Sequence, residues 1–301
     1  MVEPVTTPRR VEWRTVGLIV ACYSLWVVCL FWLTSLTLPL TILATAVVIG
    51  FHSSLTHEVL HGHPFRSQRL NEATMALPLS LMIPYNRFRD MHLAHHQDAN
   101  LTDPYDDPET NYMDPACWSQ LSRPCHWVLR ANNTMLGRIV IGTAIGQTLF
   151  LRDEWRAGWT GDGAVRLAWA LHLPGVIAVC ALVLASPMPL WAYLVSAYIG
   201  LSLIRIRTFL EHRAHEKSRA RTVIIEDRGP LAFLFLNNNL HVVHHMNPAA
   251  AWYELPGLYA AGKARYHRMN EAYIYRSYGE IFRKYLLRSK DPVPHPLWPN
   301  P

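Results

Sequence analysis

The residues in this sequence that are best suited to chemistry are histidines. The chain contains 16 of them, and three short motifs, HEVLH, HLAHH and HVVHH, hold a large share. The motif residues are His57, His61, His92, His95, His96, His241, His244 and His245. On a helix, positions i, i+3 and i+4 are neighbours on one face. Each motif is therefore expected to present its imidazoles in one direction, as a metal site requires.

The motifs contain more imidazoles than one ion can bind. A structural zinc ion takes about four protein ligands, and a catalytic zinc ion takes about three plus water. The motifs therefore predict two metal ions. Nitrogen ligands suit iron, copper, nickel or zinc, so the ligand type alone leaves the metal open. The scattered histidines are expected to be structural, and they include His52, His126, His172, His267 and His295.

Apolar stretches next to these motifs indicate a membrane protein. Half of the residues are hydrophobic and only 17% are charged. A helix of about 20 apolar residues spans the hydrocarbon core of a bilayer. We predict spans at about residues 16–38, 40–55, 167–185 and 188–204, paired into two hairpins with very short outer turns. Pro39 separates the first pair, and Ser186-Pro187 separates the second pair.

The positions of Lys and Arg predict how the hairpins are oriented. Neither outer turn contains a basic residue, whereas the N-terminus and residues 66–166 and 205–301 contain all of them. The positive-inside rule then places both termini and the histidine motifs in the cytoplasm, in a multi-pass integral membrane protein. This topology accounts for the net charge of +6, so binding to membrane lipids is expected and binding to nucleic acid is not.

The segments outside the spans are expected to form a cytoplasmic cap of residues 66–166 and 205–290. Within it, Ala73–Pro84 and Leu136–Phe150 are predicted to be interfacial or buried helices, and Asp98–Pro115 an acidic loop. Residues 291–301 are predicted to be an irregular tail, and residues 1–301 a single domain. The five cysteines form no CxxC pair, so we expect buried thiols in a reducing compartment.

The order HxxxH, HxxHH, HxxHH across two hairpins resembles the membrane fatty acid desaturase superfamily, which includes hydroxylases and carotenoid ketolases. The resemblance covers about residues 16–290 and includes the segments HHQDANLTDPYDDPE and LNNNLHVVHHMNP. It implies an all-α integral membrane fold of four transmembrane helices in two hairpins. It also implies that a cytoplasmic helical cap holds a di-metal site with two iron ions.

The resemblance implies one more ligand, a histidine just after the fourth span. The segment RTFLEHRAHE places His212 there, with His215 as the alternative. Some family members have an asparagine ligand four residues earlier, where this chain has Thr208, so a water or an open iron position is expected instead. Side chains that would orient the imidazoles are Glu58, Asp90, Asp98, Asp103, Thr208, Glu211, Asn237 and Asn238.

The resemblance also implies the reaction. Two ferrous ions would activate O2 and remove hydrogen from an unactivated C–H bond of a lipid-like substrate, with no catalytic side chains beyond the metal ligands. A fatty acyl desaturase is the favoured hypothesis. The alternative is a hydroxylase or other oxygenase of a lipid, hydrocarbon, terpenoid or small molecule. A third hypothesis is a membrane metal or haem protein without oxygenase activity.

Such a reaction needs electrons from another protein. The sequence has no GxGxxG nucleotide fingerprint and no segment resembling cytochrome b5. We therefore expect a separate ferredoxin, rubredoxin or cytochrome, together with its reductase. An acidic carrier could dock on basic cytoplasmic residues, which are Arg213, Lys217, Arg219, Arg221, Lys263, Arg265 and Arg268.

Overall fold

A computed structural model describes residues 10–97 and 101–298 of the chain. The described chain divides into two compact units. The first contains residues 10–90 and 143–204, and the second contains residues 91–142 and 205–298. Whether they act together as the single domain predicted over residues 1–301 stays a prediction, and each unit is described by itself.

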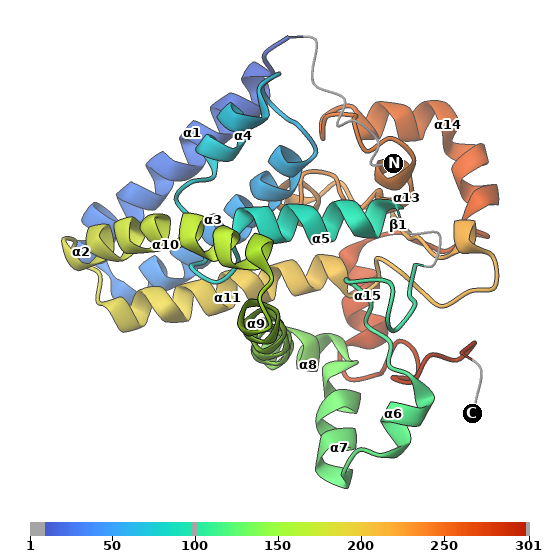
Figure 1. Ribbon diagram of the computed structural model, residues 1–301. Helices are drawn as coiled ribbons and strands as arrows, with labels where there is room; N and C mark the ends of the chain where they lie inside the picture. The colour runs from blue at the N-terminus through green and yellow to red at the C-terminus, as the bar shows by residue number, and fades with distance from the viewer. Residues whose placement is uncertain (1–9, 98–100, 299–301) are drawn as a thin grey trace. The chain divides into compact units, whose positions relative to one another are not determined.

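Four helical segments are long and apolar enough to cross a membrane, which agrees with the four predicted spans. They are Trp13–Leu36, Leu38–Leu60, Gly163–Leu184 and Leu190–Thr208. The first consists of α1 (Trp13–Val28), a π-helical turn (Cys29–Leu33) and α2 (Thr34–Leu36). The others are α3 (Leu38–Leu60), α10 (Gly163–Leu184) and α11 (Leu190–Thr208). In Figure 1, α1 and α3 lie side by side, as their mutual contacts require.

The break in the first hairpin is local in origin. Thr37 has an extended backbone, with φ −163° and ψ 118°. Pro39 then occupies the first turn of α3, where the missing N–H group costs no helical hydrogen bond. At its other end α3 continues past the predicted limit of residue 55 to Leu60. The apolar run alone underestimates this helix because its last turn carries polar residues.

Glycines allow two helices of the first unit to approach closely. A Cβ atom on Gly200 of α11 would lie 2.8 Å from the carbonyl oxygen of Ala46 and 2.9 Å from Cβ of Ile49. A Cβ atom on Gly50 of α3 would lie 3.3 Å from the carbonyl oxygen of Gly200. Small residues permit such backbone contacts between membrane helices. The α3–α11 contact thus depends on the absence of side chains at these positions.

The helix predicted over Ala73–Pro84 is wrong. Helix α4 (Gln68–Thr74) ends where that segment begins, and residues 75–84 form turns. Side chains of the long helices bind the backbone carbonyls of this loop. Tyr193 O–H donates to Leu79 O at 2.7 Å, and Nε2 of His172 donates to Leu81 O at 3.1 Å. Buried carbonyl groups need such partners, and these partners replace the hydrogen bonds of a helix.

The helix predicted over Leu136–Phe150 is present but broken. It forms α8 (Met135–Val140) and α9 (Gly142–Trp159), with Ile141 between them. Within the first unit, α9 exposes Trp155 and Trp159, whose rings stack at 5.9 Å. Glu154, just before Trp155, is buried and accepts hydrogen bonds from Arg87 at 2.9 Å and from Trp169 at 3.0 Å.

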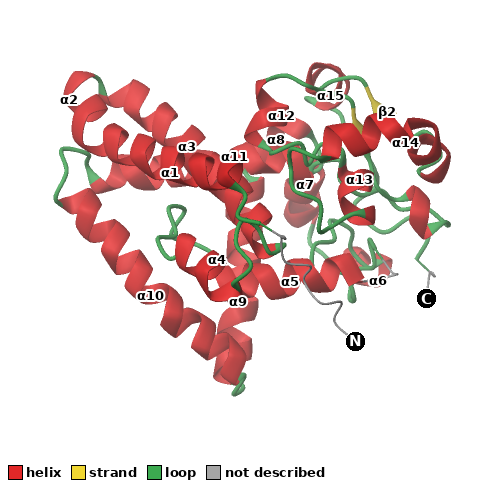
Figure 2. Cartoon of the chain, turned by 90° about the horizontal axis from the view of Figure 1, so that it is seen from above, coloured by secondary structure: helices red, strands yellow, loops and turns green. Residues whose placement is uncertain are grey.

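The second unit is built from short helices around one small sheet. Helix α5 (Tyr85–Gln97) enters it from the first unit. The strands β1 (Ile224–Ile225) and β2 (Ile274–Tyr275) pair in parallel. Strands are coloured yellow in Figure 2. The remaining helices are α6 (Pro115–Ser119), α7 (Arg123–Asn132), a 3-10 turn at Ser218–Ala220, α12 (Pro230–Leu234), α13 (His241–Met246), α14 (Leu255–Met269) and α15 (Tyr278–Tyr285).

The apolar core of the second unit supports the third histidine motif. Val242 and Val243 of α13 are buried with Ile224 of β1 and with Leu255 and Tyr259 of α14. The two valines between the histidines of HVVHH therefore anchor α13. The acidic loop is non-helical as predicted, over residues 101–114.

The prediction that all five cysteines are buried is partly wrong. Cys22 and Cys29 are buried, and Cys180 is half-buried. Cys117 and Cys125 are exposed. Cys117 lies in α6 and Cys125 in α7, and neither of these short helices has a buried residue.

We predict that Gly200→Leu lowers the melting temperature of the protein in detergent, whereas Gly17→Leu leaves it unchanged. Overpacking costs about 1–3 kcal/mol, and a side chain at Gly200 meets backbone atoms of α3. Gly17 is the matched control because a Cβ atom there has nothing within 4 Å. Equal melting temperatures for the two variants would show that the close approach is unimportant.

Candidate metal centre

Two helices and one loop bring seven histidines together in the second unit. Helix α5 carries His92, His95 and His96, helix α13 carries His241, His244 and His245, and His212 follows α11. The histidines that are almost fully buried are His92, His95, His241 and His244. Imidazoles gathered in this way are either hydrogen-bonded to one another or directed at a common ligand.

The first group in this unit consists of His92, His96 and His244. Nε2 of His96 lies 3.0 Å from Nε2 of His92 and 3.1 Å from Nε2 of His244. The rings of His92 and His96 are one helical turn apart and approach edge to face at 4.6 Å. Three ring nitrogens therefore converge on one point.

The second group consists of His95, His212, His241 and His245, whose ligand atoms all lie within 4.8 Å of one another. Nε2 of His212 lies 2.9 Å from Nε2 of His95 and 3.2 Å from Nε2 of His241. Nε2 of His245 lies 3.2 Å from Nε2 of His241. His212 is therefore the histidine after the fourth span that joins this group. The alternative, His215, pairs with Glu271 at 3.3 Å.

Each HxxHH motif is divided between the two groups, which differs from the expected single direction. The second motif contributes His92 and His96 to the first group and His95 to the second. The third motif contributes His244 to the first group and His241 and His245 to the second. Positions i+3 and i+4 are separated by about 100° around a helix axis. Adjacent histidines on one helix can thus serve two different sites.

The spacing of the nitrogens fits metal ligands. Two nitrogens about 2.1 Å from an ion are about 3.0 Å apart when they subtend a right angle, and about 3.4 Å apart in a tetrahedron. The observed Nε2 separations run from 2.9 to 3.2 Å. Separations of this size are compatible with imidazoles that share one ion.

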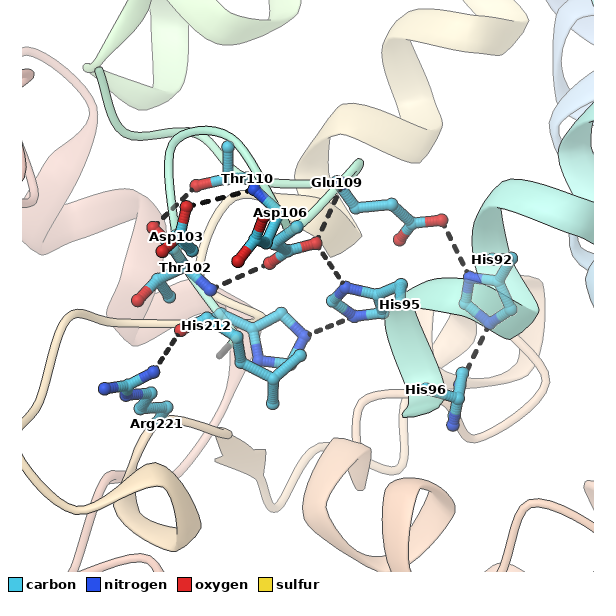
Figure 3. A network of polar contacts seen from close by, with 12 residues as sticks. His92, His95, His96, Thr102, Asp103, Asp106, Glu109, Thr110, His212 and Arg221 are labelled. Carbon is cyan, nitrogen blue, oxygen red and sulfur yellow. Dashed lines mark hydrogen bonds and ion pairs between the residues drawn. The ribbon is translucent and has the colours of Figure 1, made fainter. Parts of the chain in front are cut away.

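The acidic loop fixes the orientation of two of these rings (Figure 3). Nδ1 of His92 donates to Glu109 at 2.8 Å, and Nδ1 of His95 donates to Asp107 at 2.7 Å. Asp107 also accepts hydrogen bonds from the backbone N–H groups of Thr102 and Glu109. A carboxylate only accepts, so Nδ1 carries the proton and Nε2 keeps its lone pair for a metal. Such carboxylate–histidine pairs are typical of metal sites.

The rings of the second group have further polar partners. Nδ1 of His241 donates to Asn238 Oδ1 at 3.0 Å, and Nδ1 of His212 lies 3.4 Å from the hydroxyl oxygen of Thr222. Glu211 Oε1 lies 2.9 Å from Nε of Arg207 and 3.9 Å from Nδ1 of His241. The structure therefore places Asn238 and Glu211 beside a histidine of the site, as expected for side chains that orient the rings.

The chain belongs to the fatty acid desaturase family. The family model, described as fatty acid desaturase, matches residues 30–277, a range that includes all three motifs and His212. This family comprises desaturase- and hydroxylase-type oxidoreductases that use metal ions. No curated protein matches the sequence of this chain.

Other residues expected to orient the rings in this desaturase-family protein have different contacts. Asp103 accepts from the backbone N–H groups of Tyr105 and Asp106, Asn237 donates to Trp252 O, and Asp90 pairs with Arg89. Asp98 lies outside the described residues. The hydroxyl oxygen of Thr208 is buried and has no hydrogen-bond partner within residues 10–97 and 101–298.

Asp107, Glu109 and Thr222 are the orienting residues that the sequence did not identify. The acidic loop has several carboxylates close together, and Asp103 is nearer than Asp107 to the second motif in the chain. Only the turn at residues 102–107 shows which carboxylate points at His95. The sequence did show that an acidic loop directly follows the second motif, and this pattern could have suggested carboxylate partners for its histidines.

Burial keeps most of these imidazoles neutral. It lowers the pKa of His96, His212, His241 and His245 well below the ordinary value, and the neighbouring histidines lower it further. Burial also lowers the pKa of His95, but Glu109, Asp107 and Glu211 together raise it to about 9. Neutral imidazole is the form that binds a metal, so His212, His241 and His245 are suitable donors as they stand. His95, with its raised pKa, must release its second proton when a metal binds.

The first motif belongs to the first unit. His57 lies in the last turn of α3 and His61 caps that helix, and their ring centroids are 5.0 Å apart. Both side chains are buried. His63 instead donates from Nδ1 to Glu12 at 2.7 Å, and its Nε2 lies 3.9 Å from Glu58. Glu58 thus lies in a polar cluster with His63 and Glu12.

We predict that Asp107→Asn lowers the affinity of the protein for metal about 10–100-fold, the usual effect of losing a carboxylate behind a histidine ligand. The amide keeps the shape of the side chain but removes the charge that holds the proton on Nδ1 of His95. The measurement is bound metal by mass spectrometry after dialysis against graded concentrations of chelator.

The matched control for this variant is Asp106→Asn, an exposed carboxylate of the same loop. It is expected to retain metal like the wild type. Equal metal retention by the two variants would contradict the role assigned to Asp107.

Proposed function

We propose that this protein is an O2-dependent, non-haem di-iron oxidoreductase that acts on an unactivated C–H bond of a lipid-like substrate. Within that class we favour a fatty acyl desaturase. The observation that carries the proposal is the division of the histidines into two groups whose closest Nε2 atoms are 2.9 to 3.2 Å apart. Membership of the fatty acid desaturase family supports the same class.

In this proposal each group holds one iron ion. The second group supplies four ligands, His95, His212, His241 and His245. The first supplies His92, His96 and His244, and the order of the motifs in the sequence adds His57 and His61. Imidazole suits iron as well as zinc, and membership of the fatty acid desaturase family favours iron. Some family members have an asparagine ligand where this chain has Thr208. Here a water molecule beside the buried Thr208 hydroxyl group would take the place of that ligand.

When bound, the two ions would supply the oxygen chemistry that removes hydrogen from the substrate. The protein residues supply position and environment. Asp107, Glu109 and Asn238 hold the rings of His95, His92 and His241 with Nε2 directed at the ions. Burial of these rings limits the access of bulk water to the centre, which limits side reactions of a strong oxidant.

We propose further that the four apolar helices make this a multi-pass membrane protein with both termini and the active site in the cytoplasm. The basis is the confinement of Lys and Arg to the N-terminus and the segments outside the hairpins. Exposed tryptophans near the ends of the long helices fit the headgroup regions of a bilayer, and these are Trp13, Trp32, Trp155, Trp159 and Trp191.

A separate electron donor, a ferredoxin, rubredoxin or cytochrome with its reductase, completes the proposal. Several of the basic residues expected to attract it have partners within the protein. Lys217 pairs with Glu271, and Lys263 pairs with Glu226. Arg213 and Arg221 donate to backbone carbonyl groups. The proposed docking charges are therefore mainly the exposed side chains of Arg219, Arg265 and Arg268.

The main alternative is a hydroxylase or other oxygenase on a lipid, hydrocarbon, terpenoid or small molecule. The same site serves both reactions, because desaturation removes two hydrogens and hydroxylation adds one oxygen after the first is removed. The third hypothesis, a membrane metal or haem protein without oxygenase activity, differs in its metal content and spectrum.

We predict that expression of the wild type in a host gives a lipid product two hydrogens lighter than its substrate. His212→Ala is expected to abolish this product because the second group loses a ligand, whereas His215→Ala is expected to retain it. Mass spectrometry of host lipids and of fed candidate substrates makes the comparison, and the purified wild type should contain two iron ions per chain.

Other outcomes decide between the hypotheses. A product with one added oxygen supports the hydroxylase. A haem absorption band, or one metal ion per chain, contradicts the di-iron centre. Identical products from the wild type and His212→Ala across a broad substrate panel would contradict an oxidoreductase of this kind.

A further inference from the structure

The C-terminal segment, residues 290–298, has no regular helix or strand and lies along the acidic loop. The backbone N–H of Met113 donates to Val293 O at 3.0 Å, and the N–H of His295 donates to Met113 O at 2.8 Å. These two hydrogen bonds form a parallel bridge between Met113 and Pro294. The segment therefore extends the ordered structure of the loop that carries Asp107 and Glu109.

A chain of hydrogen bonds leads from this segment to the second histidine group. Nε2 of His295 lies 3.2 Å from the hydroxyl oxygen of Thr102, and both side chains are buried. The backbone N–H of Thr102 donates to Asp107 Oδ2 at 2.8 Å. Asp107 Oδ1 accepts from Nδ1 of His95 at 2.7 Å. His295 is thus connected to a proposed iron ligand through two intervening residues.

The same segment also contacts the other side of that group. Lys290, whose side chain is only 3% exposed, donates from Nζ to the backbone carbonyl of His212 at 2.8 Å. Tyr112 of the loop donates to Asp291 Oδ2 at 2.6 Å, and its hydroxyl oxygen accepts the N–H of Ala214 at 2.9 Å. The C-terminal segment is therefore linked by hydrogen bonds to both His95 and His212, which belong to the second group.

Aromatic contacts add to this arrangement. The ring of His295 meets the ring of Tyr112 edge to face at 5.1 Å, and the ring of Trp298 lies 5.9 Å from the ring of Tyr105. The segment therefore packs on the loop with side chains as well as with backbone groups, so its position and the position of the loop depend on each other.

We propose that residues 290–298 position the second histidine group, with His295 and Thr102 as positioning residues for His95. The inference rests on the proposed di-iron function and names a part of the chain that determines how tightly one of the two ions is held. The contacts from the segment described above lead to His95 and His212, which both belong to the second group, so we expect the larger effect on the ion of that group.

The test uses the full-length protein loaded with isotopically enriched Fe2+ and compares His295→Ala with Leu297→Ala, an exposed residue of the same segment. We expect His295→Ala to lower the affinity for one of two ions about 10-fold or more, as removal of an outer-shell partner does. Mössbauer spectra should then show one iron signal reduced and the other kept. Leu297→Ala should retain both signals.

A second variant, Thr102→Val, removes the hydroxyl group but keeps the backbone N–H that binds Asp107. It is expected to lower the affinity for iron as much as His295→Ala does. The double variant should bind iron no more weakly than either single variant, because both changes break the same chain of hydrogen bonds. Melting of the metal-free variants separates positioning from folding. A positioning role leaves these melting temperatures close to that of the wild type.

Three results would overturn the inference. The variants could retain both ions like the wild type, or lose both ions in parallel with a large fall in the melting temperature of the metal-free protein. In either case the wild type still binds two ions, so the proposed function stands and only the positioning role fails. If the wild type itself does not bind two ions, the proposed function fails and the inference fails with it.

Discussion

The buried hydrogen bond between His95 and Asp107 is the interaction on which the proposed site depends. Its length is 2.7 Å, and both side chains are about 1% exposed. A carboxylate removed from water in this way is costly unless its oxygens are bound by donors. Asp107 meets that requirement with His95 on one side and with the N–H groups of Thr102 and Glu109 on the other. One carboxylate thereby orders the loop that also presents Glu109 to His92.

Helix geometry explains how two short motifs can serve two sites. Histidines four positions apart lie nearly one above the other, whereas the one three positions along is displaced to the other side. Because α5 and α13 both have the HxxHH pattern, each contributes to both groups. The valines of α13 face the core instead. In the HVVHH motif the histidines thus supply candidate ligands, and the valines between them anchor the same turn of α13 in the core.

Features that depend on local periodicity could be predicted from the sequence. The four spans and the three motifs are of this kind, whereas His212 was expected from the family resemblance. Features that depend on partners far away in the chain could not. Tyr193 and Leu79 are 114 positions apart, and their hydrogen bond belongs to the loop that replaces the predicted helix at Ala73–Pro84. Thr102 and His295 are 193 positions apart, so their contact could not be read from the spacing of residues. The choice of Asp107 over Asp103 is local but depends on the conformation of the turn at residues 102–107, which the spacing does not specify.

The loop at residues 75–84 has a consequence for the order of assembly. Its carbonyl groups are bound by His172 of α10 and Tyr193 of α11, and Tyr23 of α1 binds the carbonyl of Thr74 at the end of α4. During synthesis this loop emerges before α10 and α11, so for a time two of its acceptors have no permanent donors. The second hairpin supplies them on arrival. The buried carbonyl groups of the loop therefore find these two donors only when the second hairpin has packed against the rest of the unit.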